Sequence, residues 1–101
     1  MTEIRHSSRA RRDLIEIWLH IGNVNQAAAD RVLRRLEARI EILRHFPEAG
    51  PLRAALGPEA RILVEPPYLI FYRVVGEGVQ IVRVVRSARR ISPTMFLEGL
   101  E

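Results

Sequence analysis

The chain has 101 residues, 48% of them hydrophobic and 28% charged, with a formal net charge of +4 and a sequence pI of about 10.9. This length and mixture suit one compact domain over residues 1–101, and they exclude a disordered chain and a multidomain one. The absence of cysteine excludes disulfides and thiolate metal sites, and no apolar run approaches the ~20 residues of a membrane span, so we expect a cytoplasmic protein without membrane contact.

A short strand and an amphipathic helix are predicted at the start of the chain. Residues 2–6 form the strand, and Ser7 or Ser8 caps a helix that runs from Arg9 to Ile21. Ile15 and Leu19 form an apolar pair off the inward stripe, and they either widen the core face or remain exposed as a seam for a partner. The inward stripe itself consists of Ala10, Leu14, Ile17, Trp18 and Ile21.

A second, longer helix follows after a connection of only a few residues. Gly22 ends the first helix, Asn25 caps the next, and residues 26 to about 45 keep a helical stripe of apolar side chains. Because the connection is so short, the two helices are expected to pack antiparallel as a hairpin.

The second half of the chain is predicted to form strands. Residues 46–51 end the helix and residues 52–60 form a surface loop. Strands are expected over Arg61–Glu65, Tyr68–Val75 and Val79–Val85, followed by a short final helix from Ser92 to Leu97. The middle strand is apolar on both faces, so it should be the central strand of a small antiparallel sheet covered by the helices. The predicted fold class is α+β, with two layers: a short N-terminal strand, a helical hairpin, a three-stranded meander and a C-terminal helix.

Conventional catalytic motifs are absent from the sequence. His6, His20 and His45 have no partner at metal-ligand spacing, no glycine-rich phosphate loop occurs, and no serine or threonine lies in a nucleophile elbow. We therefore expect no metal and no other cofactor, and among the histidines only His6 remains a catalytic candidate. Tyr68 and Tyr72 share one face of the central strand. They are either core residues with hydroxyls at the rim or, with neighbouring arginines, part of an RNA-cleaving site.

All sixteen basic residues are arginine, which binds phosphate or carboxylate but cannot shuttle a proton in an ordinary site. The segment VRVVRSARR concentrates four of them in a predicted docking patch for a target or partner, namely Arg83, Arg86, Arg89 and Arg90. The last three lie beyond the strand. Arg83 alternates onto the face of Val79, Ile81 and Val85, where it would be partly covered and would need a carboxylate or carbonyl partner.

Three segments together resemble one known family. They are RRDLIEIWLHI in the first helix, NQAAADRVLRRLEARIEILRHFPEAG through the second, and PPYLIFYRVVGEGVQIVRVVRSARRI at the end. In this order they resemble ParE-type toxins of the RelE/ParE superfamily, from bacterial type II toxin–antitoxin modules, over nearly the whole chain. The resemblance implies a toxin neutralised by a ParD-like antitoxin, whose C-terminal helix and tail wrap around it.

The resemblance also implies a target. Toxins of the ParE branch act on DNA gyrase without known catalysis of their own, whereas those of the RelE branch cleave messenger RNA in the ribosome. RelE-like cleavage uses lysines, arginines and a C-terminal tyrosine, but this chain lacks lysine and has Leu69, Met95 and Phe96 at the matching positions. It also departs from the ParE pattern "RVLHxxRD", because Arg86 and Arg90 replace the histidine and the acid.

Three hypotheses follow. The preferred one is a non-catalytic toxin that poisons DNA gyrase, contacts nucleic acid only through antitoxin or gyrase, and binds its antitoxin through an apolar seam of Ile15, Trp18 and Leu19. The alternative is a RelE-like, ribosome-dependent ribonuclease that uses Arg61, Tyr68, Tyr72 and Arg89. The third is a plain nucleic-acid-binding domain with an arginine-rich surface, for which no recognition motif is present.

Overall fold

The computed structural model describes residues 2–100, and its elements follow the predicted order. The strand β1 (Glu3–His6) precedes the helices α1 (Ser8–Gly22) and α2 (Gln26–Glu41), and a 3-10 turn, η1 (Ile42–Arg44), extends α2. The strands β2 (Arg61–Glu65), β3 (Tyr68–Val75) and β4 (Gly78–Arg86) come next, and the short helix α3 (Pro93–Glu98) follows them. The predicted α+β fold is confirmed.

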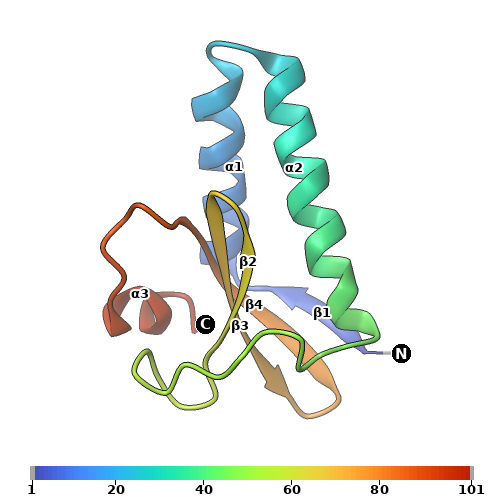
Figure 1. Cartoon of the computed structure of the whole chain (residues 1–101), viewed down its shortest axis with the longest axis vertical. Helices are drawn as coiled ribbons and strands as arrows, with labels where there is room; N and C mark the ends of the chain where they lie inside the picture. Colours follow the sequence, from blue (N-terminus) through green and yellow to red (C-terminus); the bar gives the residue numbers. More distant parts are fainter. Residues whose placement is uncertain (1, 101) are drawn as a thin grey trace.

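The four strands form one mixed sheet in the order β1-β4-β3-β2 (Figure 1). The strands β2, β3 and β4 form the predicted antiparallel meander. The strand β1 pairs with β4 in the parallel direction, with Glu3 opposite Gly78 and His6 opposite Ile81. The start of the chain is thereby joined to the last strand.

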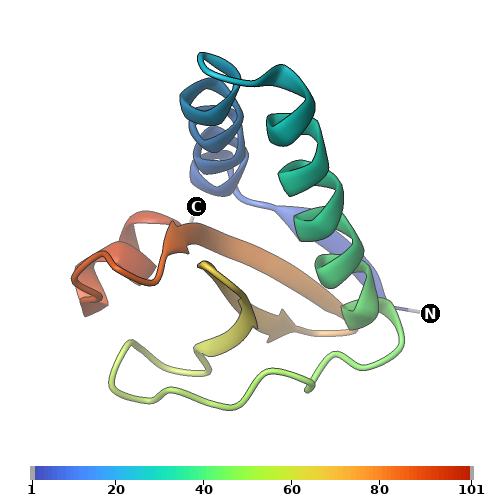
Figure 2. The same cartoon turned by 45° about the horizontal axis from the view of Figure 1, so that its top comes forward.

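Local sequence signals explain where the two long helices begin. Ser7 Oγ accepts a hydrogen bond from Ala10 N at 3.0 Å, and Asn25 Oδ1 accepts one from Ala28 N at 3.0 Å. Each of these N-caps contributes about 1 kcal/mol. The helices lie side by side as the predicted antiparallel hairpin, on one side of the sheet (Figures 1 and 2).

An apolar cluster lies on each face of the sheet. The cluster beneath the helical hairpin contains Leu36, Ile40 and Leu43 of the α2–η1 segment, together with both tyrosines of β3. On the other face, α3 and the loop before β2 cover a second cluster, which consists of Leu56, Ala60, Ile62, Phe71, Val82, Val85, Met95 and Phe96. The strand β3 is therefore apolar on both faces, as predicted, but its second face is covered by α3 and the loop rather than by the helical hairpin.

A β-bulge in β4 changes which side chains share a face. Tyr72 lies opposite Ile81 and Phe71 lies opposite Arg83, so Val82 has no residue opposite it. Beyond the bulge the alternation shifts by one position: Val84 joins the cluster beneath the hairpin, and Val85 joins the other cluster. The prediction that Arg83 shares a face with Val79 and Ile81 was wrong, because a period of two does not reveal an inserted residue.

Side chains complete the edge of β4 beyond the end of β1. Ser7 Oγ donates a hydrogen bond to Val82 O at 2.9 Å, and Ser7 N donates one to Ile81 O at 2.9 Å. Further along the same strand, Asp13 Oδ2 accepts a hydrogen bond from Val84 N at 3.0 Å. Because buried strand groups need partners, these bonds fix the start of α1 against the sheet.

Candidate functional site

Arg83 of β4 lies in the interior and is tied to two helices, α1 and α3. Its Nε donates to Asp13 Oδ2 at 2.7 Å and its Nη2 donates to Asp13 Oδ1 at 3.0 Å, which is a bidentate pair. Its Nη1 lies 3.2 Å from Glu98 Oε1 and 3.4 Å from Met95 O. Since 0% of Arg83 is exposed, it belongs to the core and not to the predicted docking patch. The expected carboxylate and carbonyl partners are both present.

The other three arginines of the patch, Arg86, Arg89 and Arg90, are exposed where β4 ends. The guanidinium carbon of Arg86 lies 5.9 Å from the centroid of the Tyr68 ring, within the range of a cation–π contact. A groove of about 420 Å³ runs between this segment and α1. Its lining includes Arg86 and Arg89 from the end of β4 and beyond it, Tyr68 from β3, and Glu16 and His20 from α1. The groove therefore offers guanidinium groups and a carboxylate to a partner, while the Tyr68 ring at its base is only 3% exposed.

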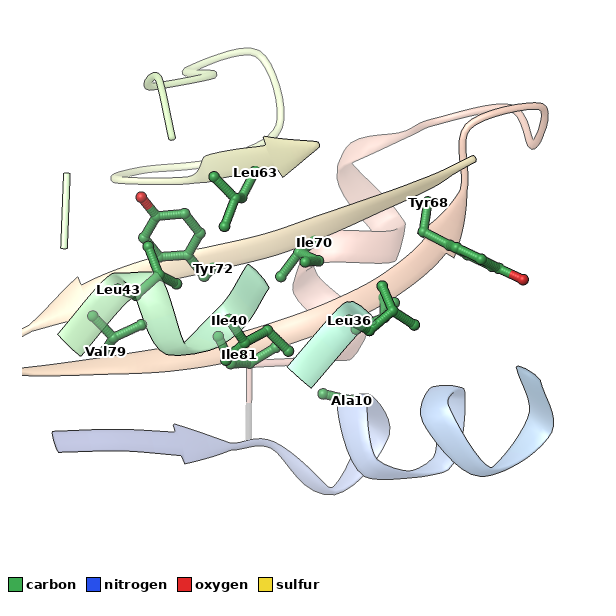
Figure 3. Packing of buried hydrophobic residues seen from close by; sticks show 11 residues of the cluster. Ala10, Leu36, Ile40, Leu43, Leu63, Tyr68, Ile70, Tyr72, Val79 and Ile81 are labelled. Atoms are coloured by element: carbon green, nitrogen blue, oxygen red, sulfur yellow. The ribbon is translucent and has the colours of Figure 1, made fainter. Parts of the chain in front are cut away.

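The structure divides the four residues of the ribonuclease alternative into two pairs. Tyr68 and Arg89 both line the groove beside α1. Tyr72 lies opposite Arg61, where β2 begins. Figure 3 shows the two tyrosines at opposite ends of the apolar cluster. Four residues along a strand span about 13 Å, so the two pairs cannot act on one scissile bond.

Tyr72 and Arg61 bind the backbone of the loop that follows η1. The Tyr72 hydroxyl donates to Pro47 O at 2.8 Å and accepts a hydrogen bond from Gly50 N at 2.8 Å. Arg61 Nη1 donates to Gly50 O at 2.8 Å. Burial raises the pKa of Tyr72, which opposes release of its proton. Both side chains thus hold a loop in place.

His6 is half-buried at the end of β1, next to the start of α1. Burial lowers the pKa of its imidazole, and the charge of Arg11 lowers it further, while Glu37 and Glu41 act in the opposite direction. The imidazole is therefore neutral at neutral pH. No group of three or more His, Asp or Glu side chains suited to a metal ion occurs within residues 2–100.

Part of the predicted apolar seam is exposed on α1. Ile15 is 58% exposed and Leu19 is 52% exposed, so these side chains do not widen the core face. They lie four residues apart and therefore one above the other on the helix. Trp18 is half-buried, and its Nε1 donates a hydrogen bond to Asp30 Oδ1 at 2.9 Å. Trp18 thus joins α1 to α2, and the exposed part of the seam is the Ile15–Leu19 pair.

Asp13 is the central residue that the sequence analysis missed. It is only 4% exposed, and it binds both the guanidinium of Arg83 and the backbone of β4. Its spacing in the sequence could have revealed that it is buried, because it stands three residues after Ala10 and four before Ile17, both on the inward stripe. A carboxylate on that face needs a buried cation or several N–H donors.

Comparisons with known proteins agree with this fold. The family model described as ParE toxin of the type II toxin–antitoxin system parDE matches residues 4–91. The chain belongs to the ParE toxin family. It is 37% identical over 89 residues to Toxin RelE2 of Caulobacter vibrioides, which covers 88% of this chain and 99% of that protein. It is 31% identical over 84 residues to the putative toxin Y4kP of Sinorhizobium fredii, covering 83% of this chain and 86% of that protein.

A solved structure resembles this ParE family member throughout most of its length. The structure is described as the chromosomal ParDE TA system from P. aeruginosa, and it superposes with a TM-score of 0.73 at 25% sequence identity. The match covers 85% of this chain and 96% of the other. Within residues 2–100, none of the helices combines the length and apolar character that crossing a bilayer requires.

Proposed function

We propose that this ParE-family toxin acts by binding and poisoning DNA gyrase and that a ParD-like antitoxin neutralises it. The observation that carries the proposal is the separation of Tyr68 and Arg89 from Tyr72 and Arg61. Each pair holds one tyrosine and one arginine, whereas a ribonuclease built from these four residues needs an acid and a base at one scissile bond, and arginine supplies neither. The exposed arginines at the end of β4 and beyond it favour a role in holding a partner.

The target surface is proposed to be the groove beside α1, which Arg86 and Arg89 line, together with the exposed Arg90 next to Arg89. Guanidinium groups form strong bidentate hydrogen bonds with carboxylates, which suits docking onto an acidic protein surface. The ring of Tyr68 beneath Arg86 limits where that guanidinium can lie. Nucleic acid would be reached indirectly, through gyrase or through the antitoxin.

The decisive experiment compares gyrase with the ribosome. The purified protein is added to a gyrase supercoiling and DNA-cleavage assay and to a translating-ribosome cleavage assay. We expect inhibited supercoiling and accumulated cleaved DNA in the first assay, and intact messenger RNA in the second. Cleavage on the ribosome without any effect on gyrase would overturn the proposal.

A charge-matched pair of variants tests the proposed target surface. Replacing Arg86, Arg89 and Arg90 with glutamine should weaken the effect on gyrase at least about tenfold, because several charge-assisted bonds are lost together. The control replaces three other exposed arginines with glutamine, namely Arg31, Arg34 and Arg53. Equal losses in both variants would indicate an effect of net charge alone.

The antitoxin is proposed to cover the apolar seam of Ile15, Trp18 and Leu19. An amphipathic helix of the antitoxin would place its apolar face against the exposed part of this seam, the Ile15–Leu19 pair. The gene of the antitoxin is expected next to the toxin gene, as a short reading frame with a ribbon-helix-helix pattern. Ile15→Ser with Leu19→Ser should abolish co-purification with that product, whereas Leu97→Ser, at another exposed apolar site, should not.

The name of one relative, Toxin RelE2, keeps the ribonuclease as a second candidate. The same pair of assays separates the two functions. If the ribonuclease is correct, Tyr68→Phe and Arg89→Gln should each reduce ribosomal cleavage, since these residues share the groove.

A further inference from the structure

A polar hollow lies on the sheet face opposite the helical hairpin, beside β1. Its volume is about 590 Å³, and its lining comes from β1, from the facing ends of β3 and β4, and from the turn between them. The residues with side chains on this face alternate with Val79 and Ile81, which point into the cluster beneath the helices. The hollow is thus separate from both the arginine groove and the apolar seam.

Two rows of residues cross the sheet at the hollow. In the first row, Arg5 of β1 lies opposite Gln80 of β4, which lies opposite Arg73 of β3. In the second row, Glu3 lies opposite Gly78, which lies opposite Val75. Because Gly78 has no side chain, the middle of the second row is open. The depression has two guanidinium groups on one side and the Glu3 carboxylate on the other, and the neighbouring Glu77 also lines it.

The charged side chains of the hollow contact one another but remain able to bind a ligand. Arg73 Nε donates to Gln80 Oε1 at 2.8 Å, and Arg5 Nε lies 2.9 Å from Glu3 Oε1. The side chains of Arg5 and Glu3 are 79% and 69% exposed, so their ion pair is weak and exchanges readily with another partner. Each guanidinium carries further N–H donors on its two terminal nitrogens.

We propose that this hollow binds an extended polypeptide segment of a protein partner, in which an acidic and a basic side chain stand two residues apart. The two rows of the hollow are two residues apart along the strands, which is about 6.6 Å. Side chains at i and i+2 of an extended peptide have the same spacing. The acidic side chain would then lie between Arg5 and Arg73, and the basic one would lie near Glu3 and Glu77.

The two carboxylates argue against a nucleic acid in this position. A phosphate chain long enough to use both arginines would bring its next phosphate towards Glu3 and Glu77, where like charges repel. A mixed-charge peptide places a positive group there instead. Since the hollow lies on the face away from α1, it would stay open while the Ile15–Leu19 pair is covered. The inference does not rest on gyrase or on any antitoxin.

Backbone amide shifts of the ¹⁵N-labelled full chain test the proposal at constant ionic strength. The probes are the peptide acetyl-Ala-Glu-Ala-Arg-Ala-amide, its neutral analogue with two glutamines, and a ten-nucleotide oligothymidylate. We expect the charged peptide to shift the amides of Val75, Gly78 and Gln80 in a saturable way, with a dissociation constant on the order of 1 mM. The other two probes should leave these amides in place.

Arg73→Gln should weaken the binding of the charged peptide about tenfold, because a charge-assisted hydrogen bond is lost. The control is Arg34→Gln, an equal change of charge on an exposed part of α2, which should not alter the binding. Both side chains lie outside the core, so both variants should fold, which their spectra would show directly. The proposal fails if the neutral peptide shifts the same amides equally, if the oligothymidylate does so with dependence on Arg73, or if none of the probes binds.

Discussion

At the scale of single residues, the interior of this protein is organised around one buried ion pair. Arg83 is completely covered, and Asp13 is bound to it through two hydrogen bonds while also accepting one from the backbone of β4. Burying two charges is costly, and the pair offsets that cost only while both partners are present. Removing one partner is therefore worse than removing both.

We predict that Asp13→Ala lowers the free energy of unfolding by about 3–5 kcal/mol, because it leaves the Arg83 guanidinium charged and without its main partner. Urea denaturation measures the loss. The double variant Asp13→Ala with Arg83→Met should recover part of it, while Glu16→Gln on the same helix should change little. A double variant less stable than Asp13→Ala would contradict this account.

Tyr72→Phe should lower the free energy of unfolding by about 1–3 kcal/mol, since the buried Gly50 N–H loses its acceptor.

The raised pKa of Tyr72 also makes the stability of the protein depend on pH, in a direction that can be stated. The folded state holds the proton above the ordinary tyrosine pKa of 10.0, at which the unfolded chain releases it. The stability due to this group is thus complete below pH 10 and falls as the pH rises through the folded value.

Denaturation at several alkaline pH values checks this expectation. The wild-type protein should lose stability above pH 10 more steeply than Tyr72→Phe does. Parallel pH profiles for the two proteins would show that the phenol ionises alike in the folded and unfolded states.

At the scale of elements, α3 is attached to the sheet by close packing around one glycine. A Cβ at position 99 would collide with Val82 O, so only glycine fits at this position without a shift of the backbone. Met95 and Phe96 of α3 are buried against the cluster that includes Phe71 and Val82. The Arg83–Glu98 contact at 3.2 Å adds a polar attachment to the same helix.

Gly99→Ala should loosen the packing of α3 and lower the free energy of unfolding by about 1–3 kcal/mol, the usual range for overpacking a core. Hydrogen exchange should show faster exchange of the Met95 amide, with little change in α2. The matched control is Gly22→Ala, where a Cβ would meet Ala29 Cβ at an ordinary distance of 3.7 Å. Faster exchange in both variants would mean that the effect does not come from the contact with Val82.

The sequence predicts some elements to the residue and misses others for identifiable reasons. The bounds of β2 and β3 were predicted correctly because Pro66-Pro67 and Gly76-Glu77 interrupt the apolar pattern on either side of β3. The bulge at Val82 and the role of Asp13 were not predicted. Both depend on what lies opposite in space, and a carboxylate in a helix looks the same in sequence whether it meets water or a buried arginine.

At the scale of the whole molecule, the fold combines local pairings with one distant pairing. The helical hairpin and the β3–β4 hairpin each join neighbours in sequence, whereas β1 pairs with β4 from the other end of the chain. Closing that long loop is entropically costly, so we expect β1 to dock late during folding.

Ile4→Ala tests the expected order of folding. Ile4 lies opposite Val79 and packs against the cluster beneath the helices. The substitution should raise the unfolding rate and leave the folding rate nearly unchanged, which corresponds to a φ-value near 0. Stopped-flow chevron plots measure both rates, with Ile70→Ala as the comparison, because Ile70 is buried in β3 opposite Val84 of β4. A φ-value near 1 for Ile4 would mean that β1 belongs to the folding nucleus.

Ser7 and Asp13, by occupying backbone groups of β4 beyond β1, also prevent that stretch from acting as a template for other chains. Open strand edges are where β-proteins recruit foreign strands and begin to form fibres. On β2, Arg39 Nε donates to Val64 O at 3.0 Å and Pro51 O accepts from Ile62 N at 3.2 Å. These bonds occupy backbone groups of β2 in the same way. These two stretches of strand backbone are thereby withheld from strands of other chains.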